Sequence, residues 1–211
     1  DEKVYNTKEQ SVSGFKTTGA PDGVTVALKG GSTAVAAGTD AGTYAMNLTA
    51  DDFAVSGDSN YKVTLKIVDG SLKINKAEIE VGVIGNKSTA TYSGSEQKVE
   101  GTMNDAPSGV TVSLKSGSTA AAKGTNAGTY KMGLTADDFT ADGGNNYTVT
   151  KINVTDGKLI IQPAAIEVTV KGNTDTKTYN GNEQKVEGFT TSTLPSGVTV
   201  KNSGAVAKGS D

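Results

Sequence analysis

One eleven-residue stretch is written three times in this chain at a constant spacing. It reads VYNTKEQSVSG at Val4–Gly14, TYSGSEQKVEG at Thr91–Gly101 and TYNGNEQKVEG at Thr178–Gly188. Its tyrosines, Tyr5, Tyr92 and Tyr179, are separated by 92−5=87 and 179−92=87 residues. Self-similarity at a fixed period is the signature of a chain built from repeated structural units. The sequence therefore predicts tandem modules with a repeat of about 87 residues.

Each repeat carries the alternation of apolar and polar residues that is typical of half-buried strands. An alternating strand is expected at Ile79–Val83 and again at Ile166–Val170. A Pro-x-Gly motif lies further along each repeat. It predicts a turn, because proline presets φ and glycine accepts a positive φ. Other expected inward positions are Val12, Val99 and Val186, then Val24, Val26, Leu28, Val110, Val112, Leu114, Val198 and Val200, then Tyr44, Met46, Leu48, Tyr130, Met132 and Leu134.

The first two repeats close with an Asp-Gly pair between apolar runs, at Asp69-Gly70 and Asp156-Gly157. Asp-Gly between such runs is a strong hairpin signal, so residues 59–68 are expected to pair with 71–75, and residues 145–155 with 158–162. One extra residue near Thr150–Lys151 leaves the alternation intact, which indicates a β-bulge. The Thr-Ala-Asp-Asp-Phe stretch that precedes each run is long enough for one short helical turn.

These patterns predict an all-β fold of tandem Ig-like, sandwich-type modules. A β-grasp-like module is the alternative if the Thr-Ala-Asp-Asp-Phe stretch forms a real helix. The first module spans residues 1–76 and lacks its first strand, the second spans 77–163 and is complete, and the third spans 164–211 and is a first half. Joints at NKAEIE and QPAAIE contain no flexible linker, so the modules are expected to form a semi-rigid row.

A half module cannot bury its alternating face. Either the chain continues beyond these residues, or modules are completed by strands from another copy. Ile166, Val168 and Val170 form the candidate strand for such an exchange, in which an extended segment adds to the sheet of a neighbouring chain.

Composition argues against several classes of function. The chain has no Cys and no His, which removes disulfides, thiol nucleophiles, the commonest general base and the commonest transition-metal ligand. Its 20 basic residues are all Lys and its net charge is −3, which argues against a nucleic-acid partner. No apolar run is long enough to insert into a membrane. We therefore expect a chain that is not an enzyme.

Three groups of polar residues are candidate sites. Gly42 with Tyr44 and Gly128 with Tyr130 follow an Asp or Asn, and predict tyrosine corners whose hydroxyls bond to backbone. Acidic pairs recur at Asp51-Asp52 and Asp137-Asp138, with Asp58 and Asp142 nearby; they serve either turns and surface charge or a Ca²⁺ ion. The pairs Glu9-Gln10, Glu96-Gln97 and Glu183-Gln184 serve either cross-strand hydrogen bonding or a covalent Thr–Gln or Lys–Asn crosslink. No other cofactor is expected.

The order YNGNEQKVEG, NAGTY, NYTVT and DGKLIIQPAAIEVTV resembles the MBG/YDG-type repeat domains of bacterial extracellular proteins. Asn6-Thr7 departs from the Tyr-x-Gly opening of that pattern. The residues that carry the repeat signature are Tyr5, Tyr92, Tyr179, Gln10, Gln97, Gln184, Gly42, Tyr44, Gly128, Tyr130, Asn60, Tyr61, Asn146 and Tyr147. The resemblance implies that the chain is part of an adhesin that is secreted or attached to the cell wall. In such proteins these domains act as spacers or adhesive elements without enzymatic activity.

Three functions follow as hypotheses. The first is an elongated stalk segment of an extracellular bacterial surface protein. The second is a fibre subunit whose chains exchange strands, and the third is a glycan- or mucin-binding module. The expected partners are further copies of the same repeat, in cis or in trans, together with a surface ligand that the sequence does not identify.

Overall fold

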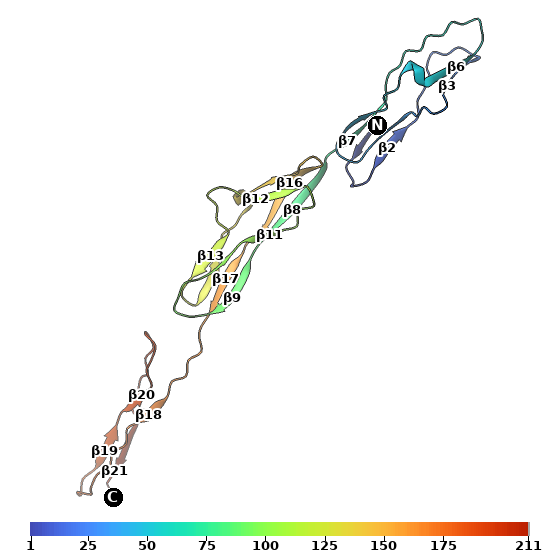
Figure 1. Ribbon diagram of the computed structural model, residues 1–211. Coiled ribbons are helices and arrows are strands. Elements are labelled where there is room, and N and C mark those ends of the chain that lie inside the picture. The colour runs from blue at the N-terminus through green and yellow to red at the C-terminus, as the bar shows by residue number, and fades with distance from the viewer. Residues whose placement is uncertain (211) are drawn as a thin grey trace. The chain divides into compact units, whose positions relative to one another are not determined.

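The computed structural model describes residues 1–210 and is all-β, as expected (Figure 1). Within those residues the helical structure consists of two three-residue 3-10 turns, η1 (Ala50–Asp52) and η2 (Ala136–Asp138). Both fall in the Thr-Ala-Asp-Asp-Phe stretches, so the longer helix that a β-grasp module requires is not formed there. Asp1–Gln162 make up one compact unit and the chain from Pro163 onward makes up a second. The described helices are all too short to span a membrane.

The second module has the fullest set of strands. They are β8 (Ala77–Gly85), β9 (Lys87–Thr91), β10 (Gln97–Glu100), β11 (Thr102–Asn104), β12 (Thr111–Leu114), β13 (Ala121–Gly124), β14 (Gly128–Lys131), β15 (Phe139–Asp142), β16 (Tyr147–Thr155) and β17 (Lys158–Gln162). Two sheets have the orders β11-β8-β16 and β14-β17-β9, and two strand pairs, β10-β13 and β12-β15, accompany them. Figure 1 shows β8 beside β11 and β16, and β9 beside β17.

The first and last strands of this module run parallel in one continuous register. Val83 pairs with Val154 and Thr91 pairs with Gln162, so the partners differ by 71 positions on both sides of the break between strands (154−83=71; 162−91=71). The register shifts between Val149 and Lys151, which confirms the bulge expected near Thr150. β8–β9 and β16–β17 therefore form a long parallel ribbon along the module.

The prediction of hairpins around the two Asp-Gly pairs is wrong. β16 and β17 pair with β8 and β9 instead of with each other. In the first module, β7 (Ser71–Asn75) pairs with β1 (Glu2–Val4) and β5 (Gly42–Ala45), and residues 58–70 form no strand. The pairing of Val63, Leu65 and Ile67 with Leu72 and Ile74 is therefore not formed.

The reason lies in what Asp156 and Gly157 contact. The Asp156 carboxylate accepts hydrogen bonds from the backbone N–H groups of Gly133 and Leu134 at 3.2 and 3.0 Å, so it fixes a neighbouring segment instead of closing a turn. A Cβ atom on Gly157 would lie 2.6 Å from the carbonyl oxygen of Asn86. Gly157 thus permits a close approach of two backbones. A glycine within a strand pattern can mark such an approach as well as a turn.

Two small cores hold the second module together. One contains Val83, Leu134 and Phe139, and the other contains Ala122, Leu159 and Ile161. In the expected first strand, Val81 and Val83 are 0% and 1% exposed while Glu80 faces solvent, so the predicted alternation is confirmed. Each core joins the parallel ribbon to the strand pairs that face it.

The first module repeats part of this arrangement. Besides β1, β5 and β7 it contains β2 (Gln10–Ser13), β3 (Val24–Leu28), β4 (Val35–Gly38) and β6 (Phe53–Gly57). They form the sheet β1-β7-β5 and the pairs β2-β4 and β3-β6. Ala36, Leu72 and Ile74 form its core. This core corresponds to the Ala122, Leu159 and Ile161 core of the second module, which lies at the end of that module nearest β9 and β17.

The third module has less structure. Its strands are β18 (Val170–Gly172), β19 (Gln184–Glu187), β20 (Phe189–Thr191) and β21 (Val206–Gly209), paired as β18-β20 and β19-β21. Of the strand expected at Ile166–Val170, Val170 alone lies in a strand, so that prediction is wrong for Ile166 and Val168; Val198 and Val200 also lie in no strand. Among residues 1–210, no buried hydrophobic side chain lies beyond Ile161.

The expected Pro-x-Gly turns are present in all three modules. The N–H groups of Val24, Val110 and Val198 donate to the carbonyl oxygens of Pro21, Pro107 and Pro195 at 3.1, 3.0 and 3.1 Å. The glycines within these turns, Gly23, Gly109 and Gly197, have φ angles of 85°, 88° and 83°. A side chain at these positions would be strained, which explains the glycine.

Candidate interaction sites

The recurring glutamine closes the loop that begins with the signature tyrosine. The Nε2 atoms of Gln10, Gln97 and Gln184 donate to the carbonyl oxygens of Val4, Thr91 and Thr178 at 3.0, 2.9 and 2.9 Å. In the first two modules this bond joins the last residue of one strand, β1 or β9, to the first residue of the next, β2 (Gln10–Ser13) or β10, so the glutamine links consecutive strands around the loop. Gly94 and Gly181 have φ angles of 79° and 77°, and Thr7 takes the same left-handed conformation at 68°. The glutamine bond therefore holds the loop even where its glycine is replaced.

The neighbouring glutamate and lysine residues make ion pairs at the surface. Glu96 pairs with Lys123 across β10 and β13 at 3.4 Å, and Glu183 pairs with Lys208 across β19 and β21 at 3.2 Å. Glu96 and Glu183 thus reach the neighbouring strand by ion pairs. Lys98, a residue of the crosslink hypothesis, lies 3.2 Å from Glu100. Such exposed pairs contribute little to stability, and the crosslink stays a prediction for mass measurement.

The two tyrosine corners are formed. The hydroxyl of Tyr44 donates to the carbonyl oxygen of Asp40 at 2.9 Å, and that of Tyr130 donates to the carbonyl oxygen of Asn126 at 3.0 Å. Each ring covers a glycine, Gly38 or Gly124, on which a Cβ atom would overlap the ring. These tyrosines are half-buried structural residues and not part of an exposed aromatic platform.

The acidic pairs serve the 3-10 turns. The Asp138 Oδ2 atom accepts hydrogen bonds from the N–H and the hydroxyl of Thr135 at 2.8 and 3.0 Å, and Oδ1 accepts one from the Ser118 hydroxyl at 2.8 Å. Asp52 is bonded in the same way by Thr49 and Ser32. These bonds, above all those from the threonine backbone, lower the pKa of both carboxyls.

The other candidate calcium ligands also cap turns. Asp58 accepts from the N–H of Asn60 and Asp142 from the N–H of Gly144, each at 2.9 Å. Across residues 1–210, no three acidic side chains gather in a way that could hold a metal ion. The arrangement agrees with turn chemistry, which was the alternative to calcium.

Signature residues of two modules meet at the joint between β7 and β8. The Asn146 side chain donates from Nδ2 to the Asp40 carboxylate at 2.8 Å, and its Oδ1 accepts from the Ala41 N–H at 2.7 Å. The Tyr147 and Tyr5 rings pack in a T-shaped arrangement, with centroids 5.2 Å apart and an interplanar angle of 85°. Burial at this contact, with Tyr147 and Asp40 nearby, raises the pKa of Tyr5. The contacts combine Tyr5, Asn146 and Tyr147 of the repeat signature with Asp40, which the sequence reading did not single out.

The linker at this joint is short and bonded. Lys76 alone separates β7 from β8, and its Nζ donates to the Gly144 carbonyl oxygen at 2.7 Å. A polar residue before Ala-Gly-Thr-Tyr in both copies, Asp40 and Asn126, was the available sequence signal for such a contact. The counterparts of the joint tyrosines are exposed: Tyr61 by 51%, Tyr92 by 43% and Tyr179 by 71%.

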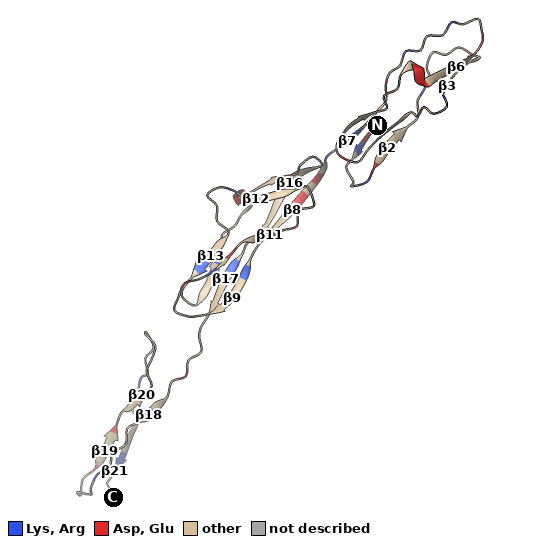
Figure 2. Ribbon diagram, in the orientation of Figure 1, with Lys and Arg blue, Asp and Glu red and all other residues tan. Residues whose placement is uncertain are grey.

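Charges of both signs are distributed over the modules. Figure 2 shows the acidic turn η1 in red next to β6, and lysines in blue on β9, β13 and β17. The ion pairs among the described residues join side chains that are 44–70% exposed. This mixture is typical of a solvated surface and differs from the one-sided charge of a nucleic-acid-binding face.

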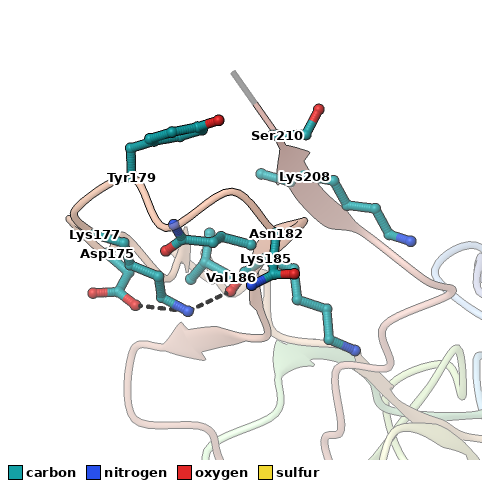
Figure 3. A pocket seen from close by; sticks show the side chains of 11 residues that line it. Asp175, Lys177, Tyr179, Asn182, Lys185, Val186, Lys208 and Ser210 are labelled. Carbon is teal, nitrogen blue, oxygen red and sulfur yellow. Dashed lines mark hydrogen bonds and ion pairs between the residues drawn. The ribbon is translucent and has the colours of Figure 1, made fainter.

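A shallow hollow of about 320 Å³ lies in the third module (Figure 3). Lys177 crosses it, 3.4 Å from Asp175 and 3.0 Å from the Lys185 carbonyl oxygen. Val186 and Ala207 line it, and their counterparts Val99 and Ala122 in the second module pack against Leu159 and Ile161. The hollow therefore lies on the face of β19 and β21 that corresponds to the core-facing side of β10 and β13.

No family model, curated protein or solved structure matches this chain in sequence or fold comparisons.

Proposed function

We propose that this chain is a structural and adhesive segment of a bacterial cell-surface or secreted repeat protein, in which tandem Ig-like modules of about 87 residues act as a stalk or spacer. The modules would belong to the MBG/YDG type that the repeat signature resembles. The observation that carries the proposal is the bonded joint between the first and second modules. A one-residue linker and side-chain contacts from both modules restrict bending, which a spacer requires.

The same joint can recur along the chain. The first-module residues that contact Asn146 and Tyr147 are Tyr5, Asp40 and Ala41. Their counterparts in the second module are Tyr92, Asn126 and Ala127. Another module of the same type that carries Asn-Tyr would find equivalent partners there. Repetition of one contact produces length without a large core, as in other repeat proteins in which each unit contacts its neighbours alone.

Binding of a glycan is less well supported. A sugar-binding platform needs several exposed aromatic side chains close together. The most exposed tyrosines, Tyr61, Tyr92 and Tyr179, belong to three different modules. The spacer role uses features that are present in the structure, whereas the glycan-binding role needs a cluster that the described residues do not show.

The test is the intact mass of the protein isolated from its source under denaturing conditions, together with surface digestion of intact cells. A species far heavier than 21.4 kDa, released by external protease and cut into fragments one repeat apart, is the expected result. A species of 21.4 kDa that external protease does not reach would contradict both the stalk and the surface location. The same spectrum would show the loss of ammonia or water that a crosslink produces.

A further inference from the structure

Three lysines of the second module stand side by side on one face of the sheet β14-β17-β9. Lys131 pairs with Lys158, and Lys158 pairs with Lys87, so the three positions form one row across the three strands. Leu159, the next residue of β17, is buried in the core, so the lysines point to the opposite face. Figure 2 shows the blue positions of β9 and β17 next to each other. We call Lys87, Lys131 and Lys158 the lysine row.

The charges of the lysine row have no partner within residues 1–210. None of the three ammonium groups makes an ion pair or a hydrogen bond there. Asp156 lies two residues before Lys158, but its carboxylate accepts bonds from the N–H groups of Gly133 and Leu134. Other lysines of the module are paired with glutamates at 3.2, 3.4 and 3.8 Å, namely Lys98, Lys123 and Lys151. The row is therefore an exception to the mixed charge of the surface.

The lysine row is not part of the repeated scaffold. The first module has Ala45 and Ser71 at the positions of Lys131 and Lys158, and they pair in the same register. The third module has Thr174 at the position of Lys87. Like charges directly opposite each other destabilise a sheet. A feature that costs stability, and that a sister module forms the same strands without, indicates a role in binding.

The residues beside the lysine row add hydroxyl groups and a small apolar surface. Thr129 pairs with Ile160, and Ile160 pairs with Thr89, so these three form the adjacent row on the same face. Both threonines are exposed and Ile160 is half-buried. Neither row contains an aromatic side chain. Tyr130, between the two rows on β14, packs against the core on the other face.

This combination selects one class of anion. Neighbouring strands are about 4.8 Å apart, which is less than the Debye length of about 8 Å at physiological ionic strength, so a phosphate near one ammonium group is attracted by its neighbours too. Lysine binds phosphate as a point charge, without the planar fork of arginine. Sugar rings and nucleic-acid bases bind best where aromatic rings can stack on them, and the two rows offer none.

We propose that the lysine row binds a linear polyol phosphate, a polymer of open-chain sugar-alcohol units joined by phosphodiesters. Its phosphates lie over the ammonium groups, its hydroxyls meet Thr89 and Thr129, and its CH₂ groups contact Ile160. Because the row crosses three strands on an open face, it suits an extended polymer with repeated charges. The inference goes beyond the proposed function, since this face can bind such a polymer whether or not the chain is part of a stalk.

The first experiment measures binding of fluorescently labelled poly(glycerol phosphate) to the 211-residue chain by anisotropy at several salt concentrations. Binding should be saturable and should weaken with salt. The plot of log K against log salt should have a slope no steeper than about −2, because three phosphate contacts contribute about −0.7 each. The row variant combines Lys87→Thr, Lys131→Ala and Lys158→Ser, the residues that the other modules have there. It should bind at least about tenfold more weakly.

The matched control removes the same number of charges from elsewhere in the second module. It combines Lys98→Ser, Lys123→Ala and Lys151→Thr, whose lysines are already neutralised by glutamates. Its affinity should stay within about twofold of the unchanged chain. Urea titration checks the fold of both variants. The row variant should be at least as stable as the unchanged chain, because the repulsion within the row is removed.

The second experiment repeats the titration with dextran sulfate and with single-stranded oligothymidylate at matched charge concentration. Both should bind more weakly than poly(glycerol phosphate). Equal or tighter binding of either would overturn the proposal, since the row would then accept sulfated sugars or nucleic acid. Absence of saturable polyol phosphate binding at low salt would also overturn it, as would equal losses in the row and control variants. The intact mass tests the proposed surface role separately from all of these results.

Discussion

Removal of the Asn146 side chain is the most direct test of the bonded joint. Its Oδ1 accepts the part-buried Ala41 N–H at 2.7 Å, whereas its bond to the Asp40 carboxylate is exposed, so water can replace that bond. One part-buried neutral hydrogen bond stabilises by about 1 kcal/mol. Asn146→Ala should therefore lower the ratio of docked to separated modules by about fivefold, since 1.4 kcal/mol corresponds to a factor of ten.

The assay is amide hydrogen exchange followed by NMR. Exchange of the Ala41 N–H should accelerate at least about fivefold in Asn146→Ala, because its acceptor is lost. The Gly42–Ile74 pairing between β5 and β7 should keep its protection, which provides an internal control. Asn145→Ala changes an exposed neighbour of the same residue type and should have no effect. Equal exchange of the Ala41 amide in both variants would refute the reasoning.

Three further results are expected within the second module. Tyr130→Phe should lower the free energy of unfolding by about 0.5–1.5 kcal/mol in urea titrations, because the corner hydrogen bond is lost; Tyr92→Phe, at an exposed ring, should not. Leu159→Ala should cost about 2–5 kcal/mol in the same assay, since Leu159 is 1% exposed, and a smaller loss would mean that this core is loosely packed. The lowered pKa of Asp138 contributes stability above its ordinary value of 3.8, and that stability is lost as the pH falls through the folded-state pKa. Asp138→Asn should therefore flatten the acid side of the stability profile measured by urea titration at several pH values, and an unchanged acid side would contradict this assignment.

Local patterns in the sequence predicted local structure well. Alternation placed Val81 and Val83 in a buried strand, and the one-residue insertion near Thr150 appears as a register shift. The tyrosine corners were predicted because their hydrogen bonds span four residues within one copy of the motif. In each case the residues that form the feature are close in the sequence or separated by a regular period.

Strand pairing was harder to predict where a signal has two meanings. Asp-Gly allows both a hairpin turn and a close crossing of backbones, and the sequence alone favours the first. The Asp156-Gly157 pair lies at a close crossing of backbones. The sequence did not predict this because the partners of Asp156, Gly133 and Leu134, lie more than twenty residues away. Asp40 was missed for the same reason, since its partner Asn146 is 106 residues along the chain.

The parallel ribbon of the second module has a mechanical consequence. β8 begins beside the start of β16, and β9 ends beside the end of β17, so the chain enters one end of the module and leaves at the other. A force that pulls on these two ends loads the hydrogen bonds of the ribbon in shear, and many must break together. An antiparallel hairpin pulled at its open end loses its bonds one at a time. Unfolding under force is governed by the unfolding rate, and the shear arrangement keeps that rate low along the direction of the strands.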